Sequence, residues 1–493
     1  MNYVSTRGKE NKKVSSAYAI KTGLASDGGL YMPESIPELT MEEISSLIGD
    51  SYEVRAAKIL SKFLSDYTYE ELLADASAAY SSEKFGECAA PVTSLGSDYM
   101  LELWHGPTSA FKDMALQIMP RLFTRALKKC GEDKKALILV ATSGDTGKAA
   151  LEGYRDVEGT SIKVFYPISG VSRVQKLQMQ TQEGSNVSVS GIVGNFDDAQ
   201  SGVKRIFSDP EMAKKLGEAG VFLSSANSIN WGRLVPQIVY YVSAYCDMVN
   251  GGDISLGDEI DVVVPTGNFG NIFACYIAKL MGLPVCKLIC ASNVNNVLTD
   301  FLRTGVYDRN RDFHTTISPS MDILISSNLE RLLYITLGSE KTAEYMSKLA
   351  RDGRYALEAD ELKLISDSFL GYYTSEEETK TTIKDAYENK NCLIDTHTAV
   401  AVNAANCYKN DYKAERKILV VSTASPYKFA NDVYIALTGK SPSDELSALT
   451  ELSSLTGVEI PSPLANLATK RAIHTGVIDK DGMDEDTLKF ASN

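Results

Sequence analysis

The stretch His105-Gly-Pro-Thr-Ser-Ala-Phe-Lys-Asp-Met-Ala115 places one lysine at the start of a predicted helix. Ser109 is expected to cap this helix, and Gly106-Pro107 provides the turn before it. Apolar residues then recur at helical spacing on two faces, and Lys112 heads one of them. The two faces are Phe111, Ala115, Ile118, Leu122 and Ala126, and Leu116, Met119, Phe123 and Leu127. Lys112 is therefore expected to lie among apolar side chains.

Such an environment favours the uncharged form of a lysine. Burial lowers the pKa of an ammonium group, and the positive end of a helix dipole adds to this effect. A neutral lysine is a nucleophile, and enzymes use it to form Schiff bases with carbonyl compounds, pyridoxal phosphate included. The alternative is an ordinary amphipathic helix whose lysine reaches solvent. This stretch alone leaves both interpretations open.

The amino-acid composition limits which classes of protein this chain can belong to. A chain of 493 residues is long enough for two or three domains. The net charge of -14 argues against nucleic acid or an anionic membrane as a partner, and no apolar run approaches the length of a membrane span. Eight scattered cysteines and four unclustered histidines predict no metal site and a reducing compartment. The first residues lack a signal-peptide pattern, so a cytoplasmic location is expected.

From Lys135 onward, short apolar runs alternate with amphipathic segments. This alternation predicts an α/β fold with open, mainly parallel sheets, two of them given the length. The predicted strands are 136–141, 161–166, 186–192, 221–224, 261–264, 285–291 and 417–422. The predicted helices among them are 147–157, 173–182, 196–207, 231–249, 271–281 and 396–408.

The same patterns predict how the chain is divided into domains. Residues 1–95 are expected to form an N-terminal domain, and residues 96–292 with 391–440 an α/β core. Strands are absent from our prediction for residues 293–390, which therefore form a predicted helical insertion. Its predicted helices are 322–337, 342–351, 359–369 and 376–389. Residues 441–493 are predicted to be a peripheral tail.

Three loops lie between a predicted strand and a predicted helix, where ligands of such sheets bind. Pro265-Thr-Gly-Asn-Phe-Gly-Asn271 can fold into a nest of amide donors for a phosphate. Ala141-Thr-Ser-Gly-Asp-Thr-Gly147 offers hydroxyls and amides that suit a carboxylate. Ala226-Asn-Ser-Ile-Asn-Trp-Gly-Arg233 combines amides with a forked cation, which suits a second phosphate.

Each loop also has an explanation without a ligand. Glycines are common in tight turns, Ser143 or Asp145 could cap a helix, and Arg233 could lie on an exposed helix. Thr423, in a fourth loop after a strand, could likewise cap the next helix or bind a ligand.

Taken together, the motifs resemble the threonine synthase family, in its longer form with an extended N-terminal domain. They are Tyr3-Val-Ser-Thr-Arg-Gly, Asp27-Gly-Gly-Leu-Tyr, His105-Gly-Pro-Thr-Ser-Ala-Phe-Lys-Asp, Thr142-Ser-Gly-Asp-Thr-Gly, Gly194-Asn-Phe-Asp-Asp-Ala, Asn227-Ser-Ile-Asn, Gly267-Asn-Phe-Gly-Asn, Ser318-Pro-Ser-Met-Asp-Ile and Thr423-Ala-Ser-Pro. The resemblance implies the fold type II architecture, in which two open α/β domains hold pyridoxal 5'-phosphate between them.

The resemblance also implies roles for particular residues. Lys112 would form the Schiff base, and Thr423 would face the pyridine nitrogen of the cofactor. The cofactor phosphate would be held by Gly267, Asn268, Phe269, Gly270 and Asn271. The substrate α-carboxylate would be held by the turn that includes Thr142, Ser143, Asp145 and Thr146. The substrate phosphate would be held by Asn227, Ser228 and Arg233.

The implied reaction converts O-phospho-L-homoserine and water to L-threonine and phosphate, with Lys112 moving the α-proton and then a β-proton. Residues 135–205 would form a smaller mobile domain that closes over the substrate. Alternatives in the same fold are a phosphohomoserine phospho-lyase and a hydroxyamino-acid dehydratase. A metabolite-binding protein without a Schiff base is an alternative of another class. The sequence leaves the assembly open between monomer and homodimer.

Overall fold

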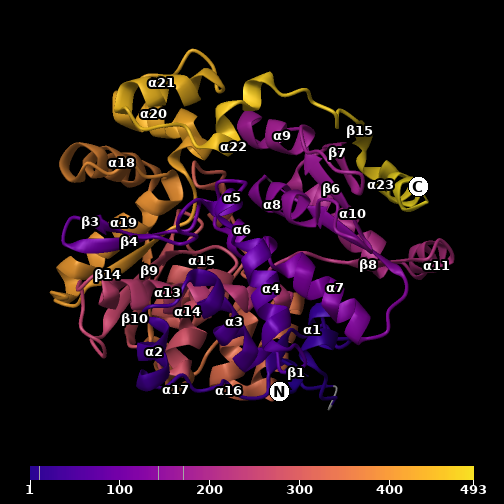
Figure 1. The fold of residues 1–493 in the computed structure, drawn as a ribbon, viewed down its shortest axis with the longest axis horizontal. Helices are drawn as coiled ribbons and strands as arrows, with labels where there is room; N and C mark the ends of the chain where they lie inside the picture. The colour runs from indigo at the N-terminus through magenta and orange to yellow at the C-terminus, as the bar shows by residue number, and fades with distance from the viewer. Residues whose placement is uncertain (10–11, 143, 170, 493) are drawn as a thin grey trace.

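The computed structural model describes residues 1–9, 12–142, 144–169 and 171–492, and two mainly parallel sheets dominate this part of the chain (Figure 1). The larger sheet has the strand order β13-β10-β9-β14-β4-β3, and only β3 runs antiparallel to its neighbour among these described strands. The smaller sheet has the order β15-β7-β6-β5-β8 and is parallel throughout. The predicted α/β architecture with two open sheets is confirmed.

Seven of the described strands agree closely with the apolar runs that predicted them, and the other strands were not predicted. The larger sheet consists of β3 (Val92–Leu95), β4 (Asp98–Glu102), β9 (Ile260–Pro265), β10 (Val285–Ser292), β13 (Phe369–Tyr373) and β14 (Ile418–Ser422). The smaller consists of β5 (Lys135–Ala141), β6 (Thr160–Pro167), β7 (Val187–Val193), β8 (Val221–Ser224) and β15 (Val477–Asp479). Two antiparallel pairs lie outside them, β1 (Tyr3–Ser5) with β2 (Tyr31–Pro33) and β11 (Val306–Asp308) with β12 (Arg354–Ala356).

The N-terminal helices pack beneath the larger sheet, against the helices that carry the site (Figure 1). Two of them begin at reciprocal capping boxes, formed by Thr40 with Glu43 and by Thr68 with Glu71. The N-terminal helices are α1 (Ser16–Thr22), α2 (Met41–Leu47), α3 (Tyr52–Phe63), α4 (Tyr69–Ala79) and α5 (Ser82–Phe85). The helices next to them are α6 (Lys112–Leu116), α7 (Met119–Lys129), α12 (Trp231–Leu234), α13 (Pro236–Asn250) and α14 (Gly270–Met281).

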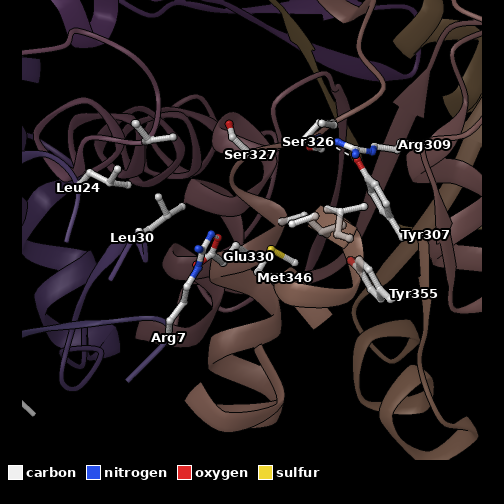
Figure 2. Close-up of a pocket in the computed structure, with 16 residues that line it drawn as sticks. Arg7, Leu24, Leu30, Tyr307, Arg309, Ser326, Ser327, Glu330, Met346 and Tyr355 are labelled. Carbon is white, nitrogen blue, oxygen red and sulfur yellow. Dashed lines mark hydrogen bonds and ion pairs between the residues drawn. The ribbon is translucent and has the colours of Figure 1, made fainter. Parts of the chain in front are cut away.

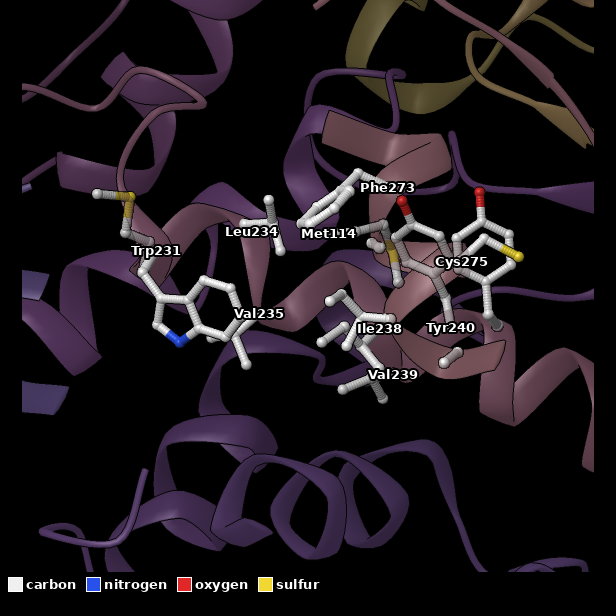
Figure 3. Close-up of a cluster of buried hydrophobic side chains, with 14 of the residues drawn as sticks. Met114, Trp231, Leu234, Val235, Ile238, Val239, Tyr240, Phe273 and Cys275 are labelled. Carbon is white, nitrogen blue, oxygen red and sulfur yellow. The ribbon is translucent and has the colours of Figure 1, made fainter. Parts of the chain in front are cut away.

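A fully buried apolar cluster fixes these helices relative to one another (Figure 3). Met114 of α6, Trp231 of α12, Ile238 of α13 and Phe273 of α14 are all inaccessible to solvent. Burying a side chain of this size contributes roughly 1.5–3 kcal/mol. Because Met114 belongs to the same short helix as Lys112, the cluster also holds the start of α6 in place.

The smaller sheet is covered by helices from the middle of the chain and by its C-terminal segment. These helices are α8 (Asp145–Tyr154), α9 (Arg173–Gln180), α10 (Phe196–Ser208), α11 (Pro210–Glu218) and α23 (Met483–Ala491). β15 lies beside β7 and pairs with it (Figure 1). Lys163 of β6 forms an ion pair with Asp486 of α23. The tail from residue 441, predicted to be peripheral, therefore contributes a strand, and this sheet extends past the predicted 135–205 domain.

The segment 293–390 contains three strands among its described residues, so the prediction of helices alone was wrong. Its helices are α15 (Val297–Thr304), η1 (Pro319–Met321), α16 (Leu329–Asp352), α17 (Ala359–Ser366) and α18 (Glu376–Lys390). β13 joins the larger sheet beside β10. A Cβ on Gly371 in β13 would lie 2.9 Å from the Cα of Thr299. The glycine that weakened the strand pattern thus allows α15 to pack closely on the sheet.

The remaining elements pack against both sheets and the helices that cover them. They are α19 (Thr396–Tyr412), η2 (Pro426–Phe429), α20 (Ala430–Thr438), α21 (Ser447–Thr456), α22 (Ser462–Ala465), η3 (Leu467–Thr469) and η4 (Lys480–Gly482). Of the helices in the described ranges, none combines the length and the apolar character that crossing a bilayer requires.

Candidate active site

Lys112 is the first residue of α6 and is 8% exposed. Its Nζ lies 3.2 Å from the Oγ of Ser320 and 3.4 Å from the Oδ2 of Asp145. Burial lowers the pKa of Lys112, the carboxylate of Asp145 opposes this, and the cations Lys428 and Arg233 lower the pKa further. The predicted burial and lowered pKa of this lysine are confirmed.

The predicted cap of this helix is wrong. Ser109 has a left-handed backbone (φ 59°), and Phe111 precedes the helix without a side-chain cap. The carboxylate of Asp113 instead accepts hydrogen bonds from the backbone N and the Oγ1 of Thr108, each at 2.7 Å. Asp113 thereby fixes the turn before Lys112, a role that Ser109 was expected to have.

Asp145, at the start of α8, uses its carboxylate for contacts within the protein. Oδ1 accepts a hydrogen bond from Gln175 (2.8 Å) and pairs with Lys428 (3.1 Å), while Oδ2 accepts one from Ser320 (3.3 Å). Burial alone would raise the pKa of Asp145, but Lys428 and Lys112 hold it well below its usual value. A permanent carboxylate repels another one, so this geometry argues against the predicted contact of Asp145 with a substrate carboxylate.

The structure describes the rest of the loop at 141–147 except for one residue. Ser143 lies outside the described residues. The Oγ1 of Thr142 accepts hydrogen bonds from the backbone N of Gly144 (3.0 Å) and of Gly147 (2.9 Å), so Thr142 ties the loop to the first turn of α8. Thr146 is half-buried in that turn.

The loop at 267–271 has the geometry of an anion site. It joins β9 to α14, and Phe269 adopts the left-handed conformation (φ 61°) just before the helix, which turns successive amides toward one side. A Cβ on Gly267 would lie 2.7 Å from the backbone O of Ser320. Ser320 therefore contacts both this loop and the amine of Lys112.

Asn271 offers a free donor at the same place. Its Oδ1 accepts hydrogen bonds from the hydroxyls of Tyr240 (2.5 Å) and Tyr241 (2.6 Å). Nδ2 is buried and has no partner among the described residues. An orphaned donor of this kind suits a ligand that carries acceptor oxygens.

Arg233 is a buried cation without a carboxylate partner in the described part of the chain. It is 6% exposed, and its guanidinium donates to the backbone O of Ala226 (2.6 Å). Burial lowers the pKa of Arg233 to about 10. Nearby, Asn227 is exposed and Ser228 accepts a hydrogen bond from Asn328 (3.2 Å). An unpaired buried guanidinium favours an anionic ligand.

Sequence reasoning missed two residues near the anion loops, Asn328, which connects the two loops, and Arg331, which holds one of them to the N-terminal segment. The Nδ2 of Asn328 also donates to the backbone O of Asn268 (2.9 Å). Arg331 is fully buried and donates to the backbone O of Ile229 (2.6 Å) and of Tyr31 (3.2 Å). No local pattern marked either residue, because both act by bridging distant backbone segments.

Three further missed residues lie around Lys112 and Asp145. Lys428 has a fully buried side chain and donates to the backbone O of Thr108 (2.7 Å). The backbone N of Ser320 donates to the Nε2 of His397 (3.1 Å). The Nδ1 of His397 lies 2.7 Å from a carboxylate oxygen of Asp395. Ser320 lies within the motif Ser318-Pro-Ser-Met-Asp-Ile, and Lys428 lies two residues after Thr423-Ala-Ser-Pro, but neither was assigned a role.

Thr423 lies beside the segment that leads into α6. Its backbone O accepts a hydrogen bond from the N of Phe111 (2.8 Å), and Ala424 forms an antiparallel bridge with Ala110. Thr423 is 6% exposed. The backbone of Thr423 therefore lies beside Phe111, the residue that precedes Lys112.

A pocket of about 320 Å³ lies behind the loop at 267–271 (Figure 2). Ser326 lines it and donates to the backbone O of Gly267 (2.8 Å). Arg7 and Glu330 form a two-bonded ion pair in its wall, with both N–O distances 3.0 Å. Lys112 does not line this pocket, so the pocket is separate from the lysine site.

Family models match most of the chain. Residues 2–80 match Threonine synthase N terminus, residues 95–360 match Pyridoxal-phosphate dependent enzyme, and residues 398–470 match Threonine synthase, C-terminal. The middle match contains Lys112 and the loop at 267–271.

Individual relatives agree with these matches. The chain is 41% identical to human Threonine synthase-like 1 over 86% of this chain and 59% of that protein, so it spans about three fifths of that relative's length. It is 38% identical to Threonine synthase from Pseudomonas aeruginosa, over 90% of this chain and 92% of the relative.

Solved structures give the same result. The crystal structure of PLP-bound Threonine synthase from Brucella melitensis matches with a TM-score of 0.88 and 35% identity over the whole of both chains. Threonine Synthase from yeast matches with a TM-score of 0.88 and 33% identity, over 99% of this chain and 98% of that one.

Proposed function

Because this chain belongs to the threonine synthase family of pyridoxal-phosphate-dependent enzymes, we propose that it converts O-phospho-L-homoserine and water to L-threonine and phosphate. The proposal rests on one observation, that a buried amine lies next to two candidate anion sites. Ser320 contacts both Lys112 and the loop at Gly267, and Asn328 connects that loop to Ser228. A substrate and a cofactor that each carry a phosphate need this pair of sites.

The residues fit pyridoxal 5'-phosphate. Gly267, Asn268, Phe269, Gly270 and Asn271 would hold its phosphate, and the unpartnered Nδ2 of Asn271 supports this assignment. Lys112 would hold the cofactor covalently through its neutral amine. The hydroxyl of Thr423 would face the pyridine nitrogen. When bound, the cofactor supplies the electron sink that acidifies the substrate protons near its amino group.

The protein's own residues would then bind the substrate and move its protons. Arg233, with Asn227 and Ser228, would hold the phosphate that leaves, and the unpaired guanidinium of Arg233 supports this role. Thr142, Ser143 and Thr146 would hold the α-carboxylate, with Asp145 at the same turn. The amine of Lys112 would take the α-proton and then a β-proton, which requires an amine whose pKa is near the working pH.

A product assay tests the proposal. The purified chain is incubated with pyridoxal phosphate and O-phospho-L-homoserine, and threonine, phosphate and 2-oxobutyrate are measured together. Equal amounts of threonine and phosphate are the expected result. Phosphate with 2-oxobutyrate and no threonine would identify a phospho-lyase, and a dehydratase would instead deaminate serine or threonine.

Domain closure, location and assembly stay predictions. We expect residues 135–205 to move toward the core when substrate binds, because substrate closure excludes water from the reacting centre. A cytoplasmic location and a monomer or homodimer remain the expected setting, to be checked by fractionation and by light scattering.

A further inference from the structure

Three buried charged side chains meet beside the proposed cofactor site. One carboxylate, that of Asp145, lies between two lysines. The Nζ of Lys428 is 3.1 Å from Oδ1, and the Nζ of Lys112 is 3.4 Å from Oδ2. All three side chains are less than 10% exposed, and that of Lys428 is fully buried.

The two lysines have different surroundings. Lys428 has a second fixed partner, the backbone O of Thr108 at 2.7 Å, so its ammonium is held by an anion and a carbonyl. Lys112 has the longer contact to Asp145, a hydroxyl, that of Ser320, and the ring of Phe111, whose centroid is 5.0 Å from Nζ. Lys428 is therefore the better placed of the two to carry the positive charge that balances Asp145.

This division of charge acts together with burial, the largest cause, on the protonation of Lys112. A lone carboxylate within about 4 Å raises the pKa of a lysine by roughly one to three units, which would keep Lys112 protonated. A carboxylate already paired with Lys428 presents a nearly neutral neighbour instead. The other groups that face Lys112 are Ser320 of η1 and Arg233 of α12, and His397 of α19 lies near Asp145.

We propose that Lys428 is a positioning residue that neutralises Asp145 and so leaves the amine of Lys112 uncharged and able to bind an aldehyde. This inference rests on the proposed role of Lys112 in the reaction above. It also explains why a carboxylate is tolerated beside a nucleophilic lysine. Asp145 orients Ser320 and Gln175, and its charge is cancelled by a residue that takes no part in the chemistry.

The test measures the protonation of Lys112 without relying on turnover. The full-length chain, free of pyridoxal phosphate, is reductively methylated with formaldehyde and borohydride at a series of pH values, and the Lys112 peptide is quantified by mass spectrometry. Only neutral amine reacts, so the labelling midpoint reports the protonation of Lys112. In the parent chain this midpoint is expected well below the ordinary lysine value of about 10.4.

The variants separate the effect of the charge of Lys428 from the effects of its size and shape. Lys428→Met is expected to raise the midpoint by about one to three units, which lowers labelling at pH 8 by roughly tenfold or more. Lys428→Arg keeps the charge and should leave the midpoint near that of the parent. The double variant Asp145→Asn with Lys428→Met removes both charges, and its midpoint should return to the parent value or below.

Two results would overturn the proposal: an ordinary midpoint in the parent chain, or the same midpoint in the parent and in Lys428→Met. If Lys428→Met does not fold, Lys428→Gln replaces it, because Gln can still donate to the carbonyl of Thr108 without carrying charge. Labelling of exposed Lys214 in the same digest controls for pH effects on the reagent. The threonine assay is independent, so a failed function and a failed charge balance give different results.

Discussion

Lys112 and Arg233 are both buried cations in one site, but their partners differ. Lys112 lies 3.4 Å from a carboxylate that a second lysine also contacts, whereas Arg233 donates to a backbone carbonyl and has no carboxylate partner in the described ranges. Burial lowers the pKa of both groups.

This difference in partners indicates two different functions for a buried cation. Around Lys112 the nearby carboxylate of Asp145 is paired with a second cation, Lys428, so the amine of Lys112 can lose and regain a proton as a reaction proceeds. Around Arg233 the counter-charge is missing, which leaves the cation to bind an anion that arrives with the substrate. The predictions below test this contrast, beginning with the largest expected effect.

Replacing Lys112 with Arg places a permanent cation beside Asp145 and removes the nucleophile. We expect threonine formation to fall by roughly 10⁴-fold or more, because the covalent anchor and the proton carrier are lost together. Lys129→Arg on α7, where the lysine pairs with Glu71 near the surface, is the matched control and should keep full activity. A Lys112→Arg chain as fast as the parent would remove Lys112 from the mechanism.

Replacing Arg233 with Met tests the unpaired cation. The KM for phosphohomoserine should rise by roughly 100-fold, since losing one partner of a buried charge pair costs about 2–5 kcal/mol. The melting temperature of the free chain should stay the same or rise, because an uncompensated buried charge is removed.

Arg125→Met tests the opposite arrangement, a cation that does have a carboxylate partner. Arg125 forms a two-bonded pair with Asp75 at 2.6 and 3.0 Å, away from the lysine site. Its loss should lower the melting temperature and leave KM unchanged. If Arg233→Met instead lowers stability with no effect on KM, Arg233 is structural and the contrast with Lys112 fails.

Gly267→Ala tests the close approach of the anion loop to Ser320. The new Cβ would lie 2.7 Å from a backbone oxygen, so the loop must move. We expect a loss of about 1–3 kcal/mol in the free energy of unfolding, and weaker binding of pyridoxal phosphate in a fluorescence titration. Gly49→Ala, where a Cβ meets no atom within 4 Å, is the control. Equal behaviour of the two variants would argue against this packing.

Asp113, next to Lys112, gives the smallest predicted effect. Burial raises the pKa of Asp113 to about 6, although the hydrogen bonds from Thr108 oppose this. The protonated acid is favoured in the folded state, so its stabilising contribution is complete below the unfolded pKa, 3.8, and is lost as pH rises through about 6.

Urea unfolding at pH 5 and at pH 7 measures this contribution. Relative to Asp113→Asn, the parent chain should lose about 1.4 kcal/mol over that interval, which corresponds to one unit of pKa difference. A constant difference between the two chains would show that Asp113 does not titrate in this range.

Much of the fold could be predicted from local patterns. Fully apolar runs located the buried parallel strands, as at Lys135–Ala141 and Ile260–Pro265. The short strands β13 and β15 were missed, because each of them pairs with a strand from a distant part of the chain and has little pattern of its own.

Some residues of the site could likewise be predicted from local patterns, and others could not. Lys112 and the loop at Gly267 could be found because helix periodicity and turn glycines are local signals. Lys428 and Arg331 could not be given roles, since what matters is which distant carboxylate or carbonyl each one meets. The cap assigned to Ser109 failed for a related reason, because Asp113 formed the stronger, charged hydrogen bonds to the turn.

The most direct test of the account asks which lysine holds the cofactor. The chain is loaded with pyridoxal phosphate, reduced with borohydride and digested, and the modified peptide is identified by mass spectrometry. The account predicts a pyridoxyl group on Lys112 and none on Lys428. Modification of Lys428, or of neither lysine, would contradict it.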